Sequence, residues 1–166
     1  MCQTQAVTDS QRGVLAPEPG RGYRIEAVGN TLVVAWWLEP EISNLVAVLH
    51  GLRDLHVRHP QGIFLFNVIT AATKMPKPAV REVLREHFSS MRGKLLAAAL
   101  VVEKPGIQGS LTRAVLTTVH TLSRAPFAMK LFSNRRAGAR WLAGHPTAMP
   151  ANLILTSAES LVASAV

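Results

Sequence analysis

The chain has 166 residues and a mass of 18.0 kDa, a length that suits one compact domain. Hydrophobic residues make up 48% of the chain and charged residues 17%, a composition that excludes disorder along the whole length. Lys and Arg exceed Asp and Glu by 18 to 10, which gives a net charge of +8 at neutral pH.

The single cysteine, Cys2, excludes an intrachain disulfide and a metal site built on cysteines. The first 20 residues hold no apolar stretch of the signal-peptide type. The longest apolar runs, such as Leu95–Val102, are far shorter than the roughly 20 residues that a membrane-spanning helix needs. We therefore expect a soluble, cytoplasmic protein without an integral membrane segment.

The first regular structure predicted along the chain is a β-hairpin. Residues 1–20 are polar and end in a cluster of proline and glycine, so we expect them to form a disordered arm. Tyr23–Val28 alternates apolar and polar side chains, as a half-buried strand does. The turn pair Gly29-Asn30 and the β-branched and aromatic residues of Thr31–Leu38 complete an antiparallel hairpin.

Trp36 and Trp37 are adjacent in the second predicted strand, so we expect their side chains to face opposite sides. One should enter the core, and the other should be covered by a helix or contact a second subunit. Because an edge strand must be protected or paired, this hairpin is the predicted surface of a homodimer.

Helices and strands alternate after the hairpin. A helix begins near Pro40, ends near His59 and carries an apolar stripe of Ile42, Leu45, Val46, Leu49 and Leu52. Ile63–Ile69 has the length and composition of a buried strand. A second helix over residues 79–92 places on one face Val80, Val83, Leu84, His87, Phe88 and Met91. Leu95–Val102 is predicted as a strand, although its alanines also suit a helix.

The last third of the chain continues the pattern. A third helix follows Pro105-Gly106, with its predicted buried stripe at Ile107, Leu111, Ala114, Val115, Thr118 and Leu122. Phe127–Phe132 is a short strand, and Ser133 or Asn134 caps the helix that contains Ala137, Trp141 and Leu142. Thr156–Glu159 has the pattern of a capping box and predicts a short C-terminal helix that starts there.

This order predicts an α/β fold: one mixed sheet of about five strands covered by helices. The first hairpin is antiparallel, and the remaining strands are largely parallel because single helices connect them. We divide the chain into the arm, 1–20, an α/β domain, 21–144, and a C-terminal extension with a short helix, 145–166.

The element order resembles that of the STAS family, which includes anti-sigma-factor antagonists, cytoplasmic domains of sulfate transporters and STAS-like bacterial proteins. The resemblance covers about residues 22–143. It is carried by YRIEAVGNTLVVAWW, the helix after Pro40, GIFLFNVIT and RRAGARWL. The spacing Ala137-Gly-Ala-Arg-Trp141-Leu142 departs from the family's Ala-x-x-Trp-Leu ending.

The resemblance implies a non-enzymatic role in binding partner proteins, small ligands or nucleotides. In antagonists of the family, phosphorylation of a Ser or Thr after the third strand, in an Asp-Ser-Ser-Gly type of motif, controls binding. That motif is absent from this chain, where Thr70 and Thr73 supply the hydroxyl groups at about the same place.

Ligands of open α/β sheets bind outside the carboxyl ends of the strands. Here these ends are followed by Thr70–Lys74, Glu103–Ser110 and Ser133–Arg136. The middle loop contains glycines and enters a helix whose free N–H groups attract anions. We predict a site for a small anionic ligand lined by Thr70, Thr73, Gly109, Ser110 and Arg113; a plain turn capped by Ser110 is the alternative.

The histidines do not predict a metal site. His50, His56 and His59 lie on or just after one helix without further ligands at a suitable spacing. His87 interrupts an apolar stripe, which indicates a partly buried, hydrogen-bonded histidine, with a catalytic role as the alternative. A nucleophilic triad cannot be assembled, and neither a catalytic residue nor a cofactor is predicted.

Positive charge is concentrated in the second half of the chain. Residues 104–166 hold seven basic side chains and one acidic side chain, Glu159, so an acidic partner, a phosphorylated ligand or an anionic surface would be attracted. Nucleic-acid binding is not predicted, because aromatic residues make up only 5% of the chain and no basic run exceeds two residues.

Two hypotheses for the function follow. The first is a non-catalytic regulatory domain that engages a protein partner and a small anionic ligand. The alternative is a small enzyme or ligand carrier with a pocket near His87, between the helix over residues 79–92 and the sheet. Attachment to anionic membranes through the basic half of the chain is a third, weaker alternative.

Overall fold

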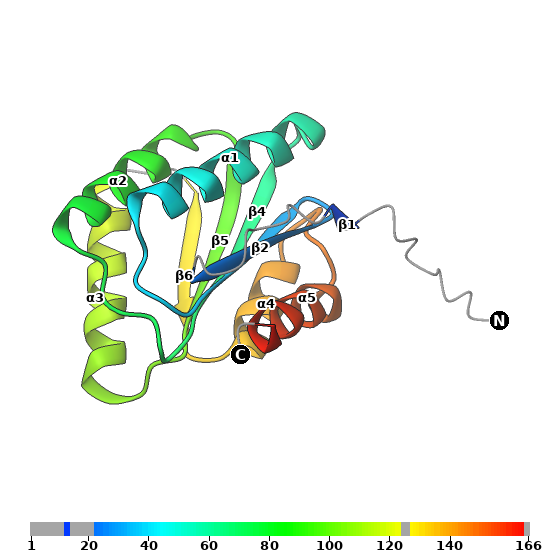
Figure 1. The fold of residues 1–166 in the computed structure, drawn as a ribbon. Coiled ribbons are helices and arrows are strands. Elements are labelled where there is room, and N and C mark those ends of the chain that lie inside the picture. The colour runs from blue at the N-terminus through cyan, green and yellow to red at the C-terminus, as the bar shows by residue number, and fades with distance from the viewer. Residues whose placement is uncertain (1–11, 14–21, 124–126, 165–166) are drawn as a thin grey trace.

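A mixed six-stranded sheet forms the middle layer of the computed structural model, which describes residues 12–13, 22–123 and 127–164 (Figure 1). The side chains of residues 12, 13, 122 and 123 are not described. In the sheet the strands lie in chain order: β1 (Arg12–Gly13), β2 (Tyr23–Val28), β3 (Thr31–Trp36), β4 (Ile63–Ile69), β5 (Leu95–Val102) and β6 (Ala128–Phe132). The pairs β1–β2 and β2–β3 are antiparallel, and the other pairs are parallel.

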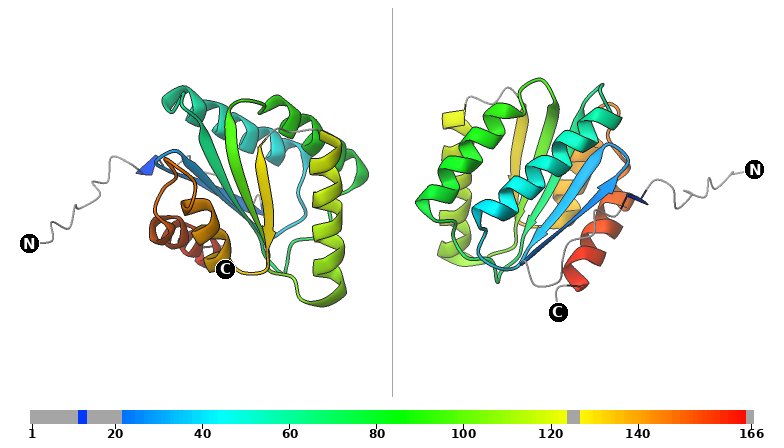
Figure 2. Two further views of the ribbon diagram at one scale, coloured as in Figure 1. Left: turned by 180° about the vertical axis from the view of Figure 1, so that it is seen from behind. Right: turned by 45° about the horizontal axis from the view of Figure 1, so that its top comes forward.

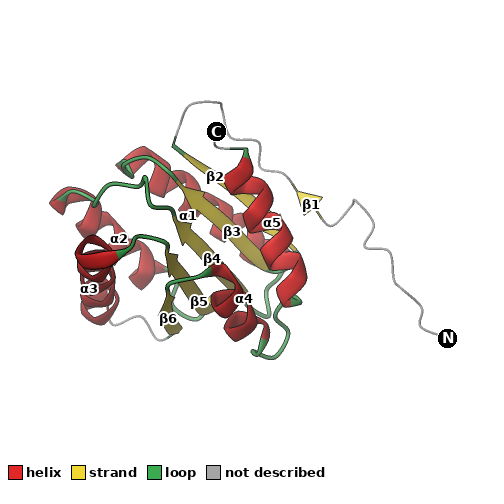
Figure 3. Ribbon diagram, turned by 90° about the horizontal axis from the view of Figure 1, so that it is seen from below, coloured by secondary structure: helices red, strands yellow, loops and turns green. Residues whose placement is uncertain are grey.

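Helices cover both faces of the sheet (Figures 1 and 2). One face carries α1 (Ile42–Arg58), α2 (Pro78–Ser90) and α3 (Gly106–Ser123), and the other carries α4 (Arg135–Ala143) and α5 (Ala151–Ala163). Figure 3 shows the two helical layers on either side of the strands. The predicted α/β class, with one mixed sheet, an antiparallel hairpin and largely parallel remaining strands, is confirmed.

The alternation of side chains along the central strands divides the core in two. In β4, Ile63, Leu65 and Ile69 pack under α1, α2 and α3, whereas Phe64, Phe66 and Val68 pack under α4 and α5. Both sets are apolar, which is why this strand reads as a continuous hydrophobic run.

The short strand β1 lies within the segment predicted to be an arm. Arg12 pairs with Val28 and Gly13 pairs with Ala27, so these two residues extend the sheet beyond β2. The rest of the predicted arm lies outside the described residues.

The second strand of the hairpin is shorter than predicted. It ends at Trp36, because the N–H groups of Trp37 and Leu38 both turn to the carbonyl oxygen of Gly22, at 2.9 and 3.2 Å. Trp36 is buried against α1–α3 and Trp37 packs, half-buried, against the opposite core. The two indoles thus face opposite sides of the sheet.

The prediction of which side of α3 is buried is wrong. Ile107, Leu111, Ala114 and Thr118 are exposed, and Val115 is half-buried, whereas Leu122 lies outside the described side chains. The buried face of α3 consists of Gly109, Thr112, Leu116 and Val119. Thr112 can be buried because its hydroxyl group donates to the Gln108 carbonyl oxygen at 2.9 Å and needs no water.

The C-terminal helix starts earlier than the capping box predicts. Helix α5 begins at Ala151, after Pro150, so Thr156 and Glu159 lie inside it. Ile154 and Ala158 pack into the core on this side of the sheet. Helix α4, by contrast, begins as predicted: the Asn134 side chain accepts a hydrogen bond from the Ala137 N–H at 2.8 Å.

A buried hydrogen bond joins α5 to β2. The Ser157 hydroxyl group donates to the Glu26 carboxylate at 2.6 Å, and both side chains are buried. We predict that Ser157→Ala lowers the free energy of unfolding by about 2 kcal/mol, because it leaves a buried carboxylate oxygen without its donor. Urea denaturation checks this value.

Ser160→Ala is the matched control, since Ser160 is exposed on the same helix. It should change the free energy of unfolding by no more than about 0.5 kcal/mol. Equal losses in the two variants would contradict a specific role for the Ser157–Glu26 bond.

Candidate functional site

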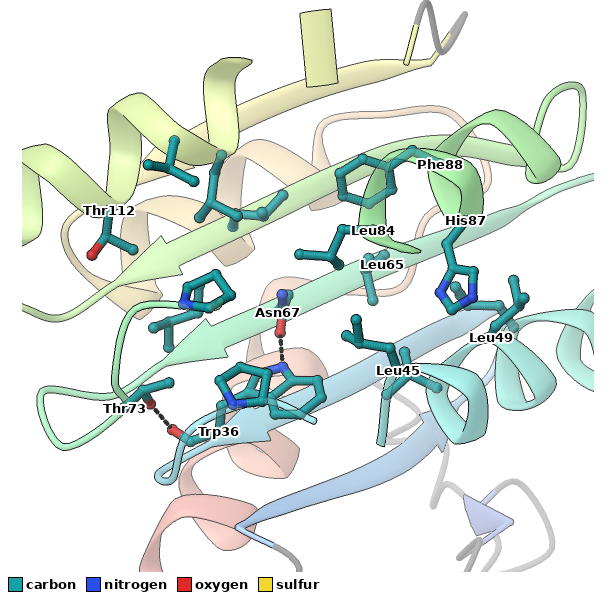
Figure 4. A pocket seen from close by; sticks show the side chains of 18 of the residues that line it. Trp36, Leu45, Leu49, Leu65, Asn67, Thr73, Leu84, His87, Phe88 and Thr112 are labelled. Atoms are coloured by element: carbon teal, nitrogen blue, oxygen red, sulfur yellow. Dashed lines mark hydrogen bonds between the residues drawn. The ribbon is translucent and has the colours of Figure 1, made fainter. Parts of the chain in front are cut away.

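A cavity of about 80 Å³ lies between the sheet and helices α1, α2 and α3. Apolar side chains from all three helices and from β4 and β5 form most of its wall, and Figure 4 shows them converging on one space. The end bordered by Pro40, Thr73 and Lys74 lies just beyond the carboxyl ends of β3 and β4. This is the position at which open α/β sheets bind ligands.

The polar centre of the cavity is a hydrogen bond between neighbouring strands. The Trp36 Nε1–H group donates to the Asn67 Oδ1 atom at 2.8 Å, and both side chains line the cavity. The Trp36 ring stacks on Tyr23 of β2, with ring centroids 5.0 Å apart and an interplanar angle of 22°. The indole and the amide are therefore fixed by three adjacent strands.

Thr70 and Thr73, two of the predicted ligand residues, are brought together in the loop after β4. Their hydroxyl oxygens lie 3.4 Å apart, and the Thr73 hydroxyl group donates to the Trp36 carbonyl oxygen at 2.7 Å. Thr73 is buried and lines the cavity, whereas Thr70 is half-buried and lies outside its wall. The Thr73 hydroxyl group thus binds the loop after β4 to the end of β3.

Gly109, Ser110 and Arg113 form a separate group in the first turns of α3. The Arg113 guanidinium donates to the Ser110 hydroxyl group at 3.3 Å, and Ser110 donates to the Gly106 carbonyl oxygen at 3.4 Å. A Cβ atom on Gly109 would lie 2.0 Å from the Lys104 carbonyl oxygen, so glycine is required for close packing there. These three residues do not line the cavity, where α3 contributes Thr112, Val115 and Leu116.

His87 lines the cavity from α2, as its place in the apolar stripe suggested. Burial lowers the pKa of its imidazole below the ordinary value of 6.5, the positive charge of Arg53 lowers the pKa further, and the Glu86 carboxylate opposes these effects. The ring is consequently neutral at pH 7. Figure 4 shows His87 at the opposite end of the cavity from Thr73 and Thr112.

A shallower, more polar groove adjoins the cavity. It has a volume of about 540 Å³ and is lined by Leu38, Glu39, Glu41, Ser43, Asn44, Ala72 and Lys74. Lys74 is exposed and borders both spaces. Glu39 is paired with Lys77 at 3.2 Å, which joins the loop before α1 to the loop before α2. The groove and the cavity therefore meet at Lys74.

Another polar contact joins the residue after β5 to α4. The Arg135 guanidinium faces the Glu103 carboxylate with N–O distances of 2.7 Å for both of its nitrogen contacts. Arg135 is thus engaged within the protein and is not a free anion-binding group.

Trp36 and Asn67 were not among the predicted site residues. The signal for Asn67 was nevertheless present in the sequence, because it is the one polar side chain in the run Ile63–Ile69. By the alternation of a strand it falls on the same face as Leu65 and Ile69. A polar side chain on an apolar face of the sheet favours a hydrogen-bond partner, and only the fold identifies the Trp36 indole as that partner.

Within the described residues, His, Cys, Asp and Glu side chains do not gather in groups of three or more that could hold a metal ion. In the same part of the chain, none of the helices combines the length and the hydropathy needed to cross a bilayer.

Comparisons with protein-family models, with curated proteins and with solved structures find no match. Kinship with the STAS family therefore stays a prediction from the sequence.

The lowered pKa of His87 predicts an acid-sensitive fold. Below pH 6.5 the unfolded chain binds a proton at this position before the folded chain does, so stability falls as the pH is lowered through this range. The His87→Gln variant should lose less unfolding free energy than the parent protein between about pH 7.5 and about pH 5. Urea denaturation at the two pH values measures the difference.

An NMR titration of the imidazole ring gives the second readout. The pKa of His87 should lie below 6.5 in the folded protein. A pKa at or above 6.5, together with equal acid sensitivity in the two proteins, would contradict the desolvation of this ring.

Proposed function

We propose that this protein is a non-catalytic binding domain that holds a small, mainly apolar molecule between the sheet and helices α1–α3. The observation that carries the proposal is the cavity itself, with apolar walls and few polar groups, the pattern of small-molecule sites. The location agrees with the sequence hypothesis of a ligand carrier near His87, and the role agrees with the hypothesis of a binding domain.

The energetic cost of the cavity supports a binding role. Protein interiors contain few voids larger than a water molecule. The side chains around this space of about 80 Å³ therefore lack some of the dispersion contacts of a fully packed core. A molecule that fills the space recovers dispersion contacts that the surrounding side chains lack.

The arrangement of the polar groups supports binding over catalysis. The hydroxyl groups of Thr73 and Thr112 donate to main-chain carbonyl oxygens, at 2.7 and 2.9 Å, and so are not aligned with a base. His87 lies across the cavity from both (Figure 4). A nucleophile activated by histidine needs the two groups within hydrogen-bond reach.

A protein partner is the second part of the proposal, and the exposed apolar side chains at the edge of the α1 stripe support it. Ile42 and Val46 lie one turn apart and are 45% and 38% exposed, and Leu38, in the segment before the helix, is 54% exposed. The adjoining side of α1 lines the cavity with Leu45, Leu49 and Leu52. A ligand that displaces α1 would therefore alter the surface that a partner meets.

Filling the cavity tests the proposal. The hydrocarbon 2-methylbut-1-ene should shift the Trp36 indole N–H resonance of the parent protein in a saturable way, since this group borders the cavity. The Leu84→Trp variant should abolish the shift because the larger ring occupies the space, while its thermal stability stays equal or rises. Heteronuclear NMR titration measures the binding.

Val57→Trp is the control, because Val57 is 80% exposed on α1 and lies outside the cavity wall. It should bind the hydrocarbon with the parental affinity. Absence of saturable shifts in the parent protein, or equal binding by Leu84→Trp, would refute the proposed site.

A further inference from the structure

The orientation of the Asn67 amide is fixed by its partner. An indole N–H group is a donor only, so the atom that faces Trp36 at 2.8 Å must be the amide oxygen. The Nδ2 group, with its two N–H donors, then points away from Trp36. Figure 4 shows the nitrogen on the side of the amide away from Trp36.

This nitrogen is an unused donor in the cavity wall, next to the Trp36–Asn67 bond. No hydrogen bond from Asn67 Nδ2 is present within residues 12–13, 22–123 and 127–164, and Asn67 is only half-buried. The hydroxyl groups of Thr73 and Thr112 are already committed to main-chain carbonyl oxygens. A molecule in the cavity that offered no acceptor would leave the Asn67 donors without water and without a partner, which is costly.

We infer that the ligand carries a neutral carbonyl oxygen that accepts a hydrogen bond from Asn67 Nδ2 while its apolar part contacts the leucines around it. This inference rests on the proposed function and specifies the ligand class. Ketones, aldehydes, esters and amides share the required chemistry.

The surroundings favour a neutral acceptor over a carboxylate. Burial of an anion among leucine side chains is costly unless a cation pairs with it. Lys74 is exposed at the end of the cavity, and burial lowers the pKa of His87, so neither supplies a buried positive charge beside Asn67. The ligand class thus differs from the small anion expected from the sequence.

The volume limits the size of the inserted group. A cavity of 80 Å³ corresponds to roughly three water molecules at the density of the liquid. Butan-2-one is a suitable probe of this size, and 2-methylbut-1-ene has the same shape with a methylene group in place of the oxygen. Propionate replaces one methyl group of butan-2-one by an anionic oxygen.

The experiment compares the three probes on the full chain by NMR titration. The Asn67 side-chain N–H resonances should shift with butan-2-one and mark the hydrogen bond. The Asn67→Leu variant should weaken butan-2-one binding about tenfold, the loss expected for one buried hydrogen bond, and should leave 2-methylbut-1-ene binding equal or tighter. Propionate should bind the parent protein more weakly than butan-2-one.

Asn67→Asp at about pH 8 is the second variant, because the carboxylate still accepts from the Trp36 indole but cannot donate. It should show the same selective loss. Asn152→Asp, the same change at an exposed position of α5, is the control and should keep the parental affinities.

The outcomes separate this inference from the proposed function. Equal effects of the Asn67 variants on the ketone and the alkene, or tighter binding of propionate than of butan-2-one, overturn the neutral carbonyl ligand and leave the cavity as a binding site. If the parent protein binds neither butan-2-one nor 2-methylbut-1-ene, both proposals are overturned.

Discussion

The hydrogen bond from the Trp36 indole to the Asn67 amide connects the fold to the cavity on which the proposed function depends. It forms across β3 and β4, whose parallel register pairs Val34 with Asn67 and places Trp36 at the end of its strand. Without the indole, the Asn67 amide oxygen would have no hydrogen-bond donor under the three helices, and the asparagine would destabilise the fold. With it, one half of the amide stabilises the sheet and the other half remains for a ligand.

Trp36 also organises the other polar groups at this end of the cavity. The Trp36 main chain accepts from Thr73, which closes the loop after β4, and the Trp36 side chain donates to Asn67. The loop, the strand end and the amide are therefore positioned by a single residue. Helices α1, α2 and α3 then supply the apolar walls, and the opposite core under α4 and α5 keeps the sheet rigid from behind.

Much of this fold could be predicted from the sequence, because its signals are local. Breakers bound Ile63–Ile69 and Leu95–Val102, and these strands occur as predicted and lie side by side. The signals failed where tertiary packing reversed a local preference. On α3, Thr112 is buried and Ile107 is exposed, and the bond from the Thr112 hydroxyl to the Gln108 carbonyl oxygen makes its burial tolerable. The capping pattern at Thr156 is overridden because Ile154 packs into the core as part of the same helix.

The candidate site was less predictable, since its central contact joins residues that are 31 positions apart. Sequence reasoning located His87 and Thr73, which line the cavity, but grouped Thr73 with Ser110 and Arg113, which lie outside its wall. The hydroxyl, glycine and arginine pattern at α3 suggested an anion site. In the structure the glycine permits close packing against the Lys104 carbonyl group, and the arginine contacts the neighbouring serine.

A crystal structure determined in the presence of butan-2-one tests the central claim most directly. We predict electron density for the ketone between α1, α2 and the sheet, with its oxygen about 2.9 Å from Asn67 Nδ2 and the Trp36–Asn67 bond intact. A cavity closed by rearranged side chains, or an Asn67 amide turned so that its nitrogen faces a protein acceptor, would contradict the account.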